Sequence, residues 1–548
     1  MSEELFRKYE EELDQHYKNF HIYNLNDNSK LYALLASYDS MLLPYLLDQG
    51  ALEKSPGATL QFKTLDDSLS YCLRWLCEKK PKNLESTSNN KIIELADEIL
   101  SFGTNYTDIS DMHMMYGRNL VEIEINKHQR KIKFKIKDED SDKKEIHSFL
   151  ETYEFHKIIG KKNKQKNLKL AQQCMQDIPN IKTELKEGRI ILSDISQINH
   201  SQFKSLIENE VNTEIIPIKN SADLSGFSFG EYKKYWSAMS NWSNCLLLLF
   251  LFNIKRGIDQ SKCMPTQLLE EKEFILNIKI LSGLKEETIT RIVNRLTYDF
   301  KNKKAEILLQ PFIKLKNRIL WSPLIIRKSR HERNILKLMS RNPRLKKISD
   351  NIIGERERSF LNLIGNLLSK KSGYQFKLNT NISNQELTAE MDILAYKSNA
   401  STEVLVIEGK TILTVDETNE ISDATGKLIN AQQQIGKAIG ILQSLDKEKK
   451  KELFKFVNWD KVSNYYPIIM TPDSHPNTLY NDDIVPHISY TSLITFGKKG
   501  DFSRPSRIHR FCKEKEWIKE KTPEKSYGHK DIKIGDITYS LPYIKIKR

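Results

Sequence analysis

Two apolar segments, residues 389–396 (AEMDILAY) and 403–413 (EVLVIEGKTIL), constrain the fold more than any other part of this chain. Both are rich in aliphatic and β-branched residues, a composition typical of buried strands. The polar residues between them, Lys397–Glu403, are suited to a hairpin connection. The sequence therefore predicts two neighbouring strands in the core of a sheet.

Side-chain alternation along these strands assigns the charged residues to faces. Asp392 is predicted to point away from Met391 and Ile393, which share the other face. In the second strand, Glu408 and Lys410 share one face. Pairing of the two strands would then bring Asp392 and Glu408 side by side.

Two carboxylates on apolar strands repel each other, and their burial is costly unless a cation lies between them. Oxygen ligands of this kind are suited to Mg²⁺ or Mn²⁺. Hydrolysis of a phosphodiester needs an activated water and stabilisation of the negative charge that develops on the phosphate. The Lys410 ammonium can orient that water or meet a phosphate oxygen, so the three residues predict a metal-dependent hydrolytic site with Asp392 and Glu408 as ligands.

The segments around these strands predict the order α-β-β-β-α-β. The first helix ends at Gly373, which is a natural helix C-terminal cap. In chain order, the predicted elements are a helix over Glu355–Lys371, strands over Tyr374–Leu378, Glu390–Tyr396 and Val404–Leu413, a helix over Thr418–Leu445 and a strand over Tyr465–Met470.

The two central strands, with this element order, resemble the PD-(D/E)xK nuclease superfamily over about a quarter of the chain. The resemblance implies a restriction-endonuclease-like fold and Mg²⁺- or Mn²⁺-dependent cleavage, endonucleolytic by preference. Asp392 would be the first metal ligand, Glu408 the second and Lys410 the catalytic lysine. Two departures are Met391, where the motif has proline, and Gly409, where an apolar residue is more usual. Restriction or defence against foreign DNA is a common use of this superfamily.

Two further site candidates follow from the resemblance and from helix geometry. The superfamily often takes an acidic residue from its first helix, and at about 100° per residue Glu357 falls on the apolar stripe whereas Glu355 falls nearly opposite. Some branches use a glutamine of the second helix, where Gln432 lies nearest the inward face. For Glu357 the alternative is a helix-dipole contact at the first turn, and for Gln432 it is plain helix surface.

An excess of basic residues favours a polyanionic partner. The formal net charge is +14 and the isoelectric point is near 9.1. Lysines that neutralise phosphates release counterions, which favours binding. Lys427 and Lys437 on the second helix are candidates for contacts with nucleic acid, of which DNA is the favoured kind.

The whole chain is predicted to be a multidomain α+β protein. Its parts are a mainly helical region over 1–190 with a β-hairpin near 121–137, a helical middle region over 191–345, the nuclease domain over 346–500 and a basic C-terminal extension over 501–548. The apolar run at 245–252 is too short to span a membrane. Six cysteines without metal-binding spacing favour a reducing, cytoplasmic setting.

Alternative functions remain open at this point. The α/β domain could be a catalytically inactive, nuclease-like module for nucleic-acid binding or assembly. The N-terminal region could sense a partner, and a homo-oligomer or a separate protein partner is compatible with the sequence. No Walker A motif is present, so the chain supplies no ATP motor of this type.

Overall fold

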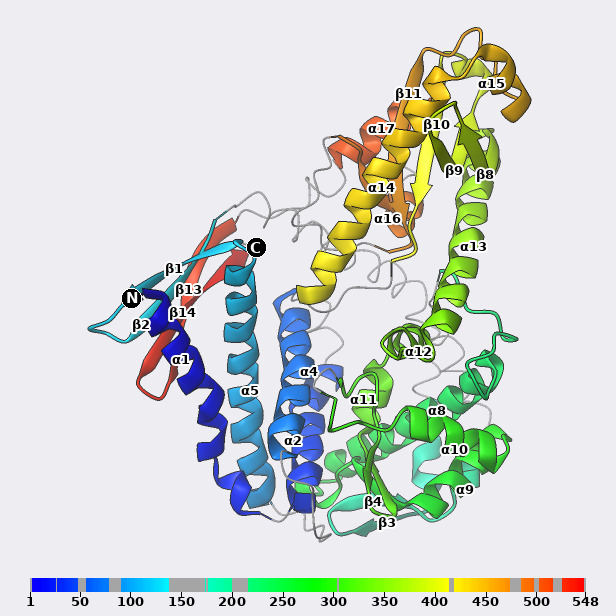
Figure 1. Ribbon diagram of the computed structural model, residues 1–548. Helices are drawn as coiled ribbons and strands as arrows, with labels where there is room; N and C mark the ends of the chain where they lie inside the picture. Colours follow the sequence, from blue (N-terminus) through cyan, green and yellow to red (C-terminus); the bar gives the residue numbers. More distant parts are fainter. Residues whose placement is uncertain are drawn as a thin grey trace.

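Figure 1 shows the computed structural model as a ribbon. The buried hydrophobic side chains of its described residues form three cores, one in the N-terminal and middle regions and two on the faces of an α/β sheet. The structure describes residues 2–25, 27–47, 56–77, 90–137, 173, 176–199, 215–302, 305–412, 418–473, 484–496, 502–515 and 525–546. Within these residues, no helix is both long enough and apolar enough to cross a membrane. The described cysteines, Cys72, Cys77, Cys245, Cys263 and Cys512, are free thiols, and Cys174 lies outside the described residues.

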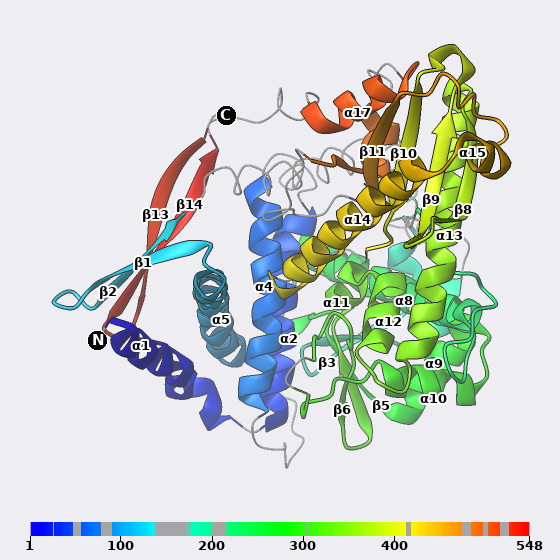
Figure 2. The same cartoon turned by 45° about the horizontal axis from the view of Figure 1, so that its top comes forward.

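The N-terminal region combines helices with a sheet that takes strands from both ends of the chain. Its helices are α1 (Ser2–His16), α2 (Asp27–Leu47), α4 (Pro56–Leu76) and α5 (Asn90–Gly117). Its strands are β1 (Val121–Asn126), β2 (Lys131–Ile136), β13 (Lys525–Ile534) and β14 (Ile537–Ile546). The sheet order is β1-β2-β14-β13, with β14 parallel to β2. The predicted hairpin near 121–137 is therefore present, and part of the predicted C-terminal extension completes its sheet (Figure 2).

The middle region is built around the long helix α8 (Phe229–Lys255), which contains the apolar run at 245–252. Ser228 caps its start through a reciprocal capping box with Glu231. The other helices are α9 (Glu271–Ser282), α10 (Glu286–Arg295), α11 (Pro323–Lys328) and α12 (His331–Ser340). The strands are β3 (Thr183–Lys186), β4 (Arg189–Leu192), β5 (Gln267–Glu270), β6 (Ile313–Leu315) and β7 (Arg318–Trp321).

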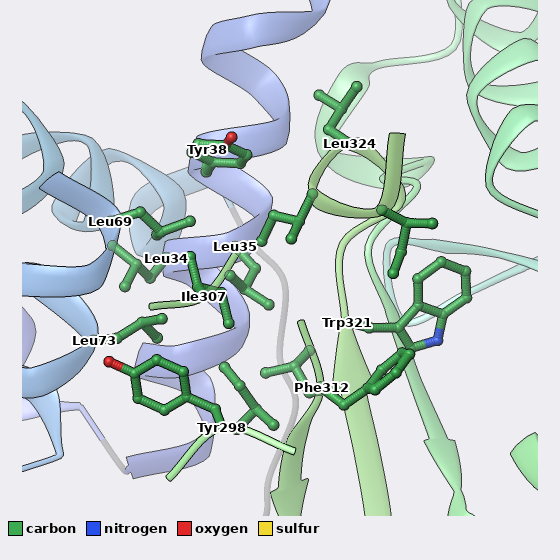
Figure 3. Close-up of a cluster of buried hydrophobic side chains, with 14 of the residues drawn as sticks. Leu34, Leu35, Tyr38, Leu69, Leu73, Tyr298, Ile307, Phe312, Trp321 and Leu324 are labelled. Carbon is green, nitrogen blue, oxygen red and sulfur yellow. The ribbon is translucent and has the colours of Figure 1, made fainter. Parts of the chain in front are cut away.

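The N-terminal and middle regions share one continuous core. Figure 3 shows Leu34 and Leu35 of α2 and Leu73 of α4 in the same cluster as Phe312 and Trp321 of the middle region. The boundary predicted near residue 190 therefore does not separate two hydrophobic cores.

The α/β unit has a five-stranded sheet of order β12-β11-β10-β9-β8. Strands β8 (Gln375–Ser383), β9 (Thr388–Tyr396) and β10 (Glu403–Gly409) pair antiparallel, whereas β10, β11 (Asn464–Thr471) and β12 (His487–Ser489) pair parallel. The helices are α13 (Lys346–Ser372), α14 (Thr418–Ser444), α15 (Lys447–Leu453), α16 (Tyr490–Phe496) and α17 (Pro505–Glu514). The predicted α-β-β-β-α-β order is present, with α15 inserted before β11.

The two faces of this sheet have separate cores. Helices α13 and α17 cover the face that carries Ile393 and Ile407. Helix α14 covers the face that carries Leu394 and Val406. Because both faces are buried, the central strand β10 contains the continuous apolar run Val404–Ile407.

The α/β unit is joined to the rest of the protein by a continuous helix and by ion pairs. Ile352 of α13 packs in the N-terminal and middle core, while Phe360 of the same helix packs on the sheet. In addition, Glu420 in the first turn of α14 pairs with Lys337 of α12, at 2.5 Å between Oε1 and Nζ. The boundary predicted at 345/346 coincides with the start of α13, but this helix crosses from one core to the next.

Candidate active site at the end of strand β10

The register of β9 and β10 brings Asp392 and Glu408 together. The last paired residues are Ile393 and Ile407, so the same register places Asp392 opposite Glu408 at the next position. The backbone N–H of Gly409 donates to Asp392 Oδ2 at 2.9 Å. Asp392 and Glu408 therefore lie side by side, as strand alternation predicts. The Asp392 carboxylate accepts from the Gly409 N–H in place of a backbone carbonyl of the neighbouring strand.

The alternation of β9 shifts at Asp392. Met391 packs in the α14 core together with Leu394, whereas Ile393 packs in the α13 core. The prediction that Met391 and Ile393 share a face is therefore wrong. Asn379, which lies opposite Asp392 in the register of β8, has a positive φ of 45°. Strands β8 and β9 are thus both locally distorted at the site. Such bulges are common in strands beside functional residues.

Burial raises the pKa of both carboxyls. For Asp392 the Gly409 N–H and Lys410 oppose this effect, whereas Glu357 and Glu390 add to it. For Glu408, which is 4% exposed, the charge of Asp392 adds to the effect of burial. The charge of Asp392 therefore favours the protonated form of Glu408, as expected for two acids confined in one site.

Lys410 supplies a cation beside this pair. Its Nζ lies 2.8 Å from Glu408 Oε1, and its backbone N–H donates to the carbonyl of Met470 in β11 at 2.9 Å. Burial lowers the pKa of Lys410, but the attraction of Glu408, Asp392 and Glu357 outweighs it and raises the pKa overall. The lysine is therefore held in its charged form by three carboxylates.

The two candidate acids of α13 have different surroundings. Glu357 is half-buried, and its charge acts on Asp392, Glu408 and Lys410. Glu355 is exposed and forms an ion pair with Lys219 at 3.0 Å. The helix phase predicted from the apolar stripe thus agrees with the structure.

The candidates on α14 differ in their exposure. Gln432 is half-buried, whereas Lys427 and Lys437 are exposed on the outer side of the helix. The structure thus presents the two lysines to solvent.

Three further residues near the site have notable surroundings. Thr411 is buried, and its Oγ1 has no hydrogen-bond partner among the described residues. At the ends of β11 and β12, Thr471 Oγ1 and His487 Nε2 lie 2.8 Å apart and both side chains are buried. This pair was not predicted from the sequence, because β12 is a strand of only three residues and has no clear sequence pattern.

The donor set of this site fits a divalent cation held in part by a substrate. Within the described part of the chain, no three His, Cys, Asp or Glu side chains gather closely enough to hold a metal ion by themselves. Asp392 and Glu408 offer two hard oxygen donors, and Mg²⁺ is commonly bound by one or two carboxylates with waters and substrate phosphates.

Comparison with known proteins identifies no relative. No protein-family model, curated protein or solved structure matches this chain.

Proposed function

We propose that this chain is a metal-dependent nuclease that hydrolyses phosphodiester bonds in nucleic acid, with DNA as the favoured substrate. The observation that carries the proposal is the cluster of Asp392, Glu408 and Lys410, which lies at the end of β10 beside the middle of β9, with Lys410 Nζ 2.8 Å from Glu408. The order of elements and the helices on both faces of the sheet support a PD-(D/E)xK-like core.

Each residue of the cluster has a role that its surroundings support. Asp392 and Glu408 would hold Mg²⁺ or Mn²⁺. Such an ion, when bound, supplies Lewis acidity toward a phosphate oxygen and lowers the pKa of water. The Gly409 N–H fixes the Asp392 carboxylate, so that its other oxygen keeps its orientation. Lys410 remains charged and can pair with a phosphoryl oxygen as negative charge develops there.

Glu357 and the lysines of α14 complete the proposal. Glu357 lies near enough to affect all three residues electrostatically, so it is the candidate for orienting the attacking water. Lys427 and Lys437 are exposed on the helix that covers the Glu408 face of the sheet, where they can contact the nucleic-acid backbone.

Cleavage assays with single- and double-stranded DNA and RNA, with and without Mg²⁺ or Mn²⁺, test this proposal. We expect metal-dependent cleavage, and a loss of about 10²–10⁴-fold for Lys410→Ala, a size typical of losing one positioned catalytic group. Lys449→Ala, which changes an exposed lysine of α15, is the matched control and should retain activity. Binding without any cleavage by the unmodified protein would favour the inactive, nuclease-like alternative.

Calorimetry with Mn²⁺ tests the metal ligands separately from activity. Asp392→Asn removes the charge but keeps an oxygen that can accept the Gly409 N–H, so the fold should survive. We expect the variant to lose Mn²⁺ binding while its circular dichroism is unchanged. Equal affinity in the two proteins would contradict the assignment of Asp392 as a ligand.

A further inference from the structure

Arginine is distributed unevenly along the chain. It accounts for 20 of the 86 Lys and Arg residues, and residues 359–503 contain none. Arg504, Arg507 and Arg510 then follow within seven residues, and Lys513 continues the same three-residue spacing. From residue 359 to residue 503 lysine is therefore used in place of arginine, and the return of arginine coincides with α17.

Helix α17 is fixed to the sheet by its apolar side. Ile508 and Cys512 are buried in the core that α17 shares with α13. At its N-terminus, the Ser506 N–H donates to Glu403 Oε2 of β10 at 3.0 Å. Both views show α17 beside β11, and the helix therefore presents a defined outer side (Figures 1 and 2).

The outer side of α17 is strongly basic. Arg507 and Arg510 are exposed on the side opposite the buried Ile508 and Cys512. The N-cap Arg504 and Lys513 are exposed at the two flanks, because each three-residue step turns about 60° around the helix. The acid on the helix, Glu514, lies 3.9 Å from Arg510, whose side chain remains 68% exposed. An exposed pair at this distance contributes little, so the outer side keeps its positive potential.

We infer that this outer side of α17 binds the phosphate backbone of nucleic acid, an inference that rests on the proposed nuclease function. Guanidinium groups present paired donors that match phosphate oxygens better than an ammonium does. From Arg504 to Lys513 the helix rises about 13.5 Å, at about 1.5 Å per residue. One strand of B-DNA has a phosphate about every 3.4 Å along its axis, so a strand that follows this curved basic surface offers about as many phosphates as there are cations.

The position of α17 extends the surface available to nucleic acid. Helix α17 covers the sheet face opposite to α14, which carries Lys427 and Lys437. It packs on β10, β11 and β12, the parallel strands whose carboxyl ends include the Lys410 region. A nucleic acid on α17 would thus be anchored to the unit that carries the site, through contacts separate from those of α14.

Binding measurements without catalysis test the inference. The Lys410→Ala protein is titrated without metal into labelled 20-mers of double-stranded DNA, single-stranded DNA and RNA over a range of salt concentrations. Arg504→Ala/Arg510→Ala is the test variant, because the pair of Arg510 with Glu514 is long and exposed, whereas Arg507 and Lys513 have further interactions within the chain. Loss of two phosphate contacts should lower the slope of log affinity against log salt by about 1.4–1.8 and weaken binding.

Two matched variants make the result specific. Lys449→Ala/Lys455→Ala removes the same charge from exposed positions near α15 and should leave the slope unchanged. Arg504→Lys/Arg510→Lys keeps the charge but loses the paired donors, so it should keep the slope and weaken binding. An unchanged slope in the arginine-to-alanine variant, or an equal loss in the α15 control, would overturn the inference.

The outcome is distinguishable from that of the proposed function. Salt-dependent binding through α17 by a protein that cleaves nothing would leave this inference standing and refute the nuclease. Metal-dependent cleavage by the unmodified protein, together with normal nucleic-acid binding by Arg504→Ala/Arg510→Ala, would support the nuclease and refute the inference about α17. Binding of poly-glutamate through α17, with no binding of nucleic acid, would refute the assigned partner.

Discussion

Glu357 and Glu355 lie two residues apart on α13, and only Glu357 interacts electrostatically with Asp392, Glu408 and Lys410 in the described structure. We expect Glu357→Gln to lower the cleavage rate by about 10²-fold, because it removes a positioned acid without changing the side-chain shape. Glu355→Gln should be almost silent, since it removes an exposed ion pair with Lys219. Single-turnover cleavage kinetics measure both, and the reverse ranking would contradict the assignment.

Simple periodicity predicted most of the candidate site at this scale. Strand alternation placed Asp392 beside Glu408, and helix phase turned Glu357 toward them. It failed for Met391, because the alternation shifts where Asp392 turns its carboxylate to the Gly409 N–H. A shift of this kind depends on a contact between two strands, and the pattern of one sequence does not predict such a contact.

At the scale of elements, alanine substitutions at two glycines of α13 should have opposite effects on stability. A Cβ on Gly365 would meet three ring atoms of Phe376 of β8 at 2.4–2.7 Å, whereas a Cβ on Gly354 would meet nothing within 4 Å. Gly365→Ala should therefore destabilise the α/β unit by about 1–3 kcal/mol through overpacking. Gly354→Ala should stabilise α13 by about 0.5–1 kcal/mol, because alanine favours the helix.

Hydrogen–deuterium exchange checks this pair of variants. Amides of β8 should lose protection in Gly365→Ala, and amides of α13 should gain it in Gly354→Ala. Equal effects of the two substitutions would mean that helix propensity, and not the contact with Phe376, governs both positions.

The ends of elements were harder to predict than their order. Gly373 stops α13 as expected, with φ 69°. The helix starts at Lys346 and not at Glu355, because its first turns pack on the middle region, which a local pattern does not show.

Strand β10 ends at Gly409, before the predicted end at Leu413, which lies outside the described residues. Its pairing with β9 ends at Ile407, where the side chain of Asp392 replaces a backbone acceptor.

At the scale of the whole molecule, the sheet shared by the two ends of the chain was not predictable from local sequence. Strand β14 pairs with β2 about 400 residues away, and Lys131 of β2 also pairs with Asp531 of β13 at 2.6 Å. The alternating pattern in 121–137 predicts a hairpin but does not indicate which segment of the chain supplies the next strand of its sheet. A parallel partner so distant in sequence leaves no periodic signal, and the domain order predicted from the sequence therefore placed these residues in a separate extension.

Removal of residues 525–548 tests how far the N-terminal region depends on the distant hairpin. Among the residues whose burial is described, the hairpin contributes five buried hydrophobic side chains to the N-terminal core, which are Ile532, Ile534, Ile537, Tyr539 and Leu541. Each contributes about 1.5–3 kcal/mol when fully buried, and domains have only about 5–15 kcal/mol of net stability. We expect hydrogen–deuterium exchange to show loss of protection in β1 and β2, while β9 and β10 stay protected because their cores contain no hairpin residue.

Two single substitutions separate the packing of this hairpin from its polar contacts. Tyr539→Phe removes one hydrogen bond, from Tyr539 Oη to the carbonyl of Tyr9 at 3.0 Å, and should cost about 1 kcal/mol. Lys131→Ala removes a partly exposed ion pair and should cost about 1 kcal/mol or less. Neither should reproduce the truncation, because both leave the five apolar contacts in place. Full protection of β1 and β2 in the truncated protein would show that the N-terminal sheet is stable without the strands from the other end of the chain.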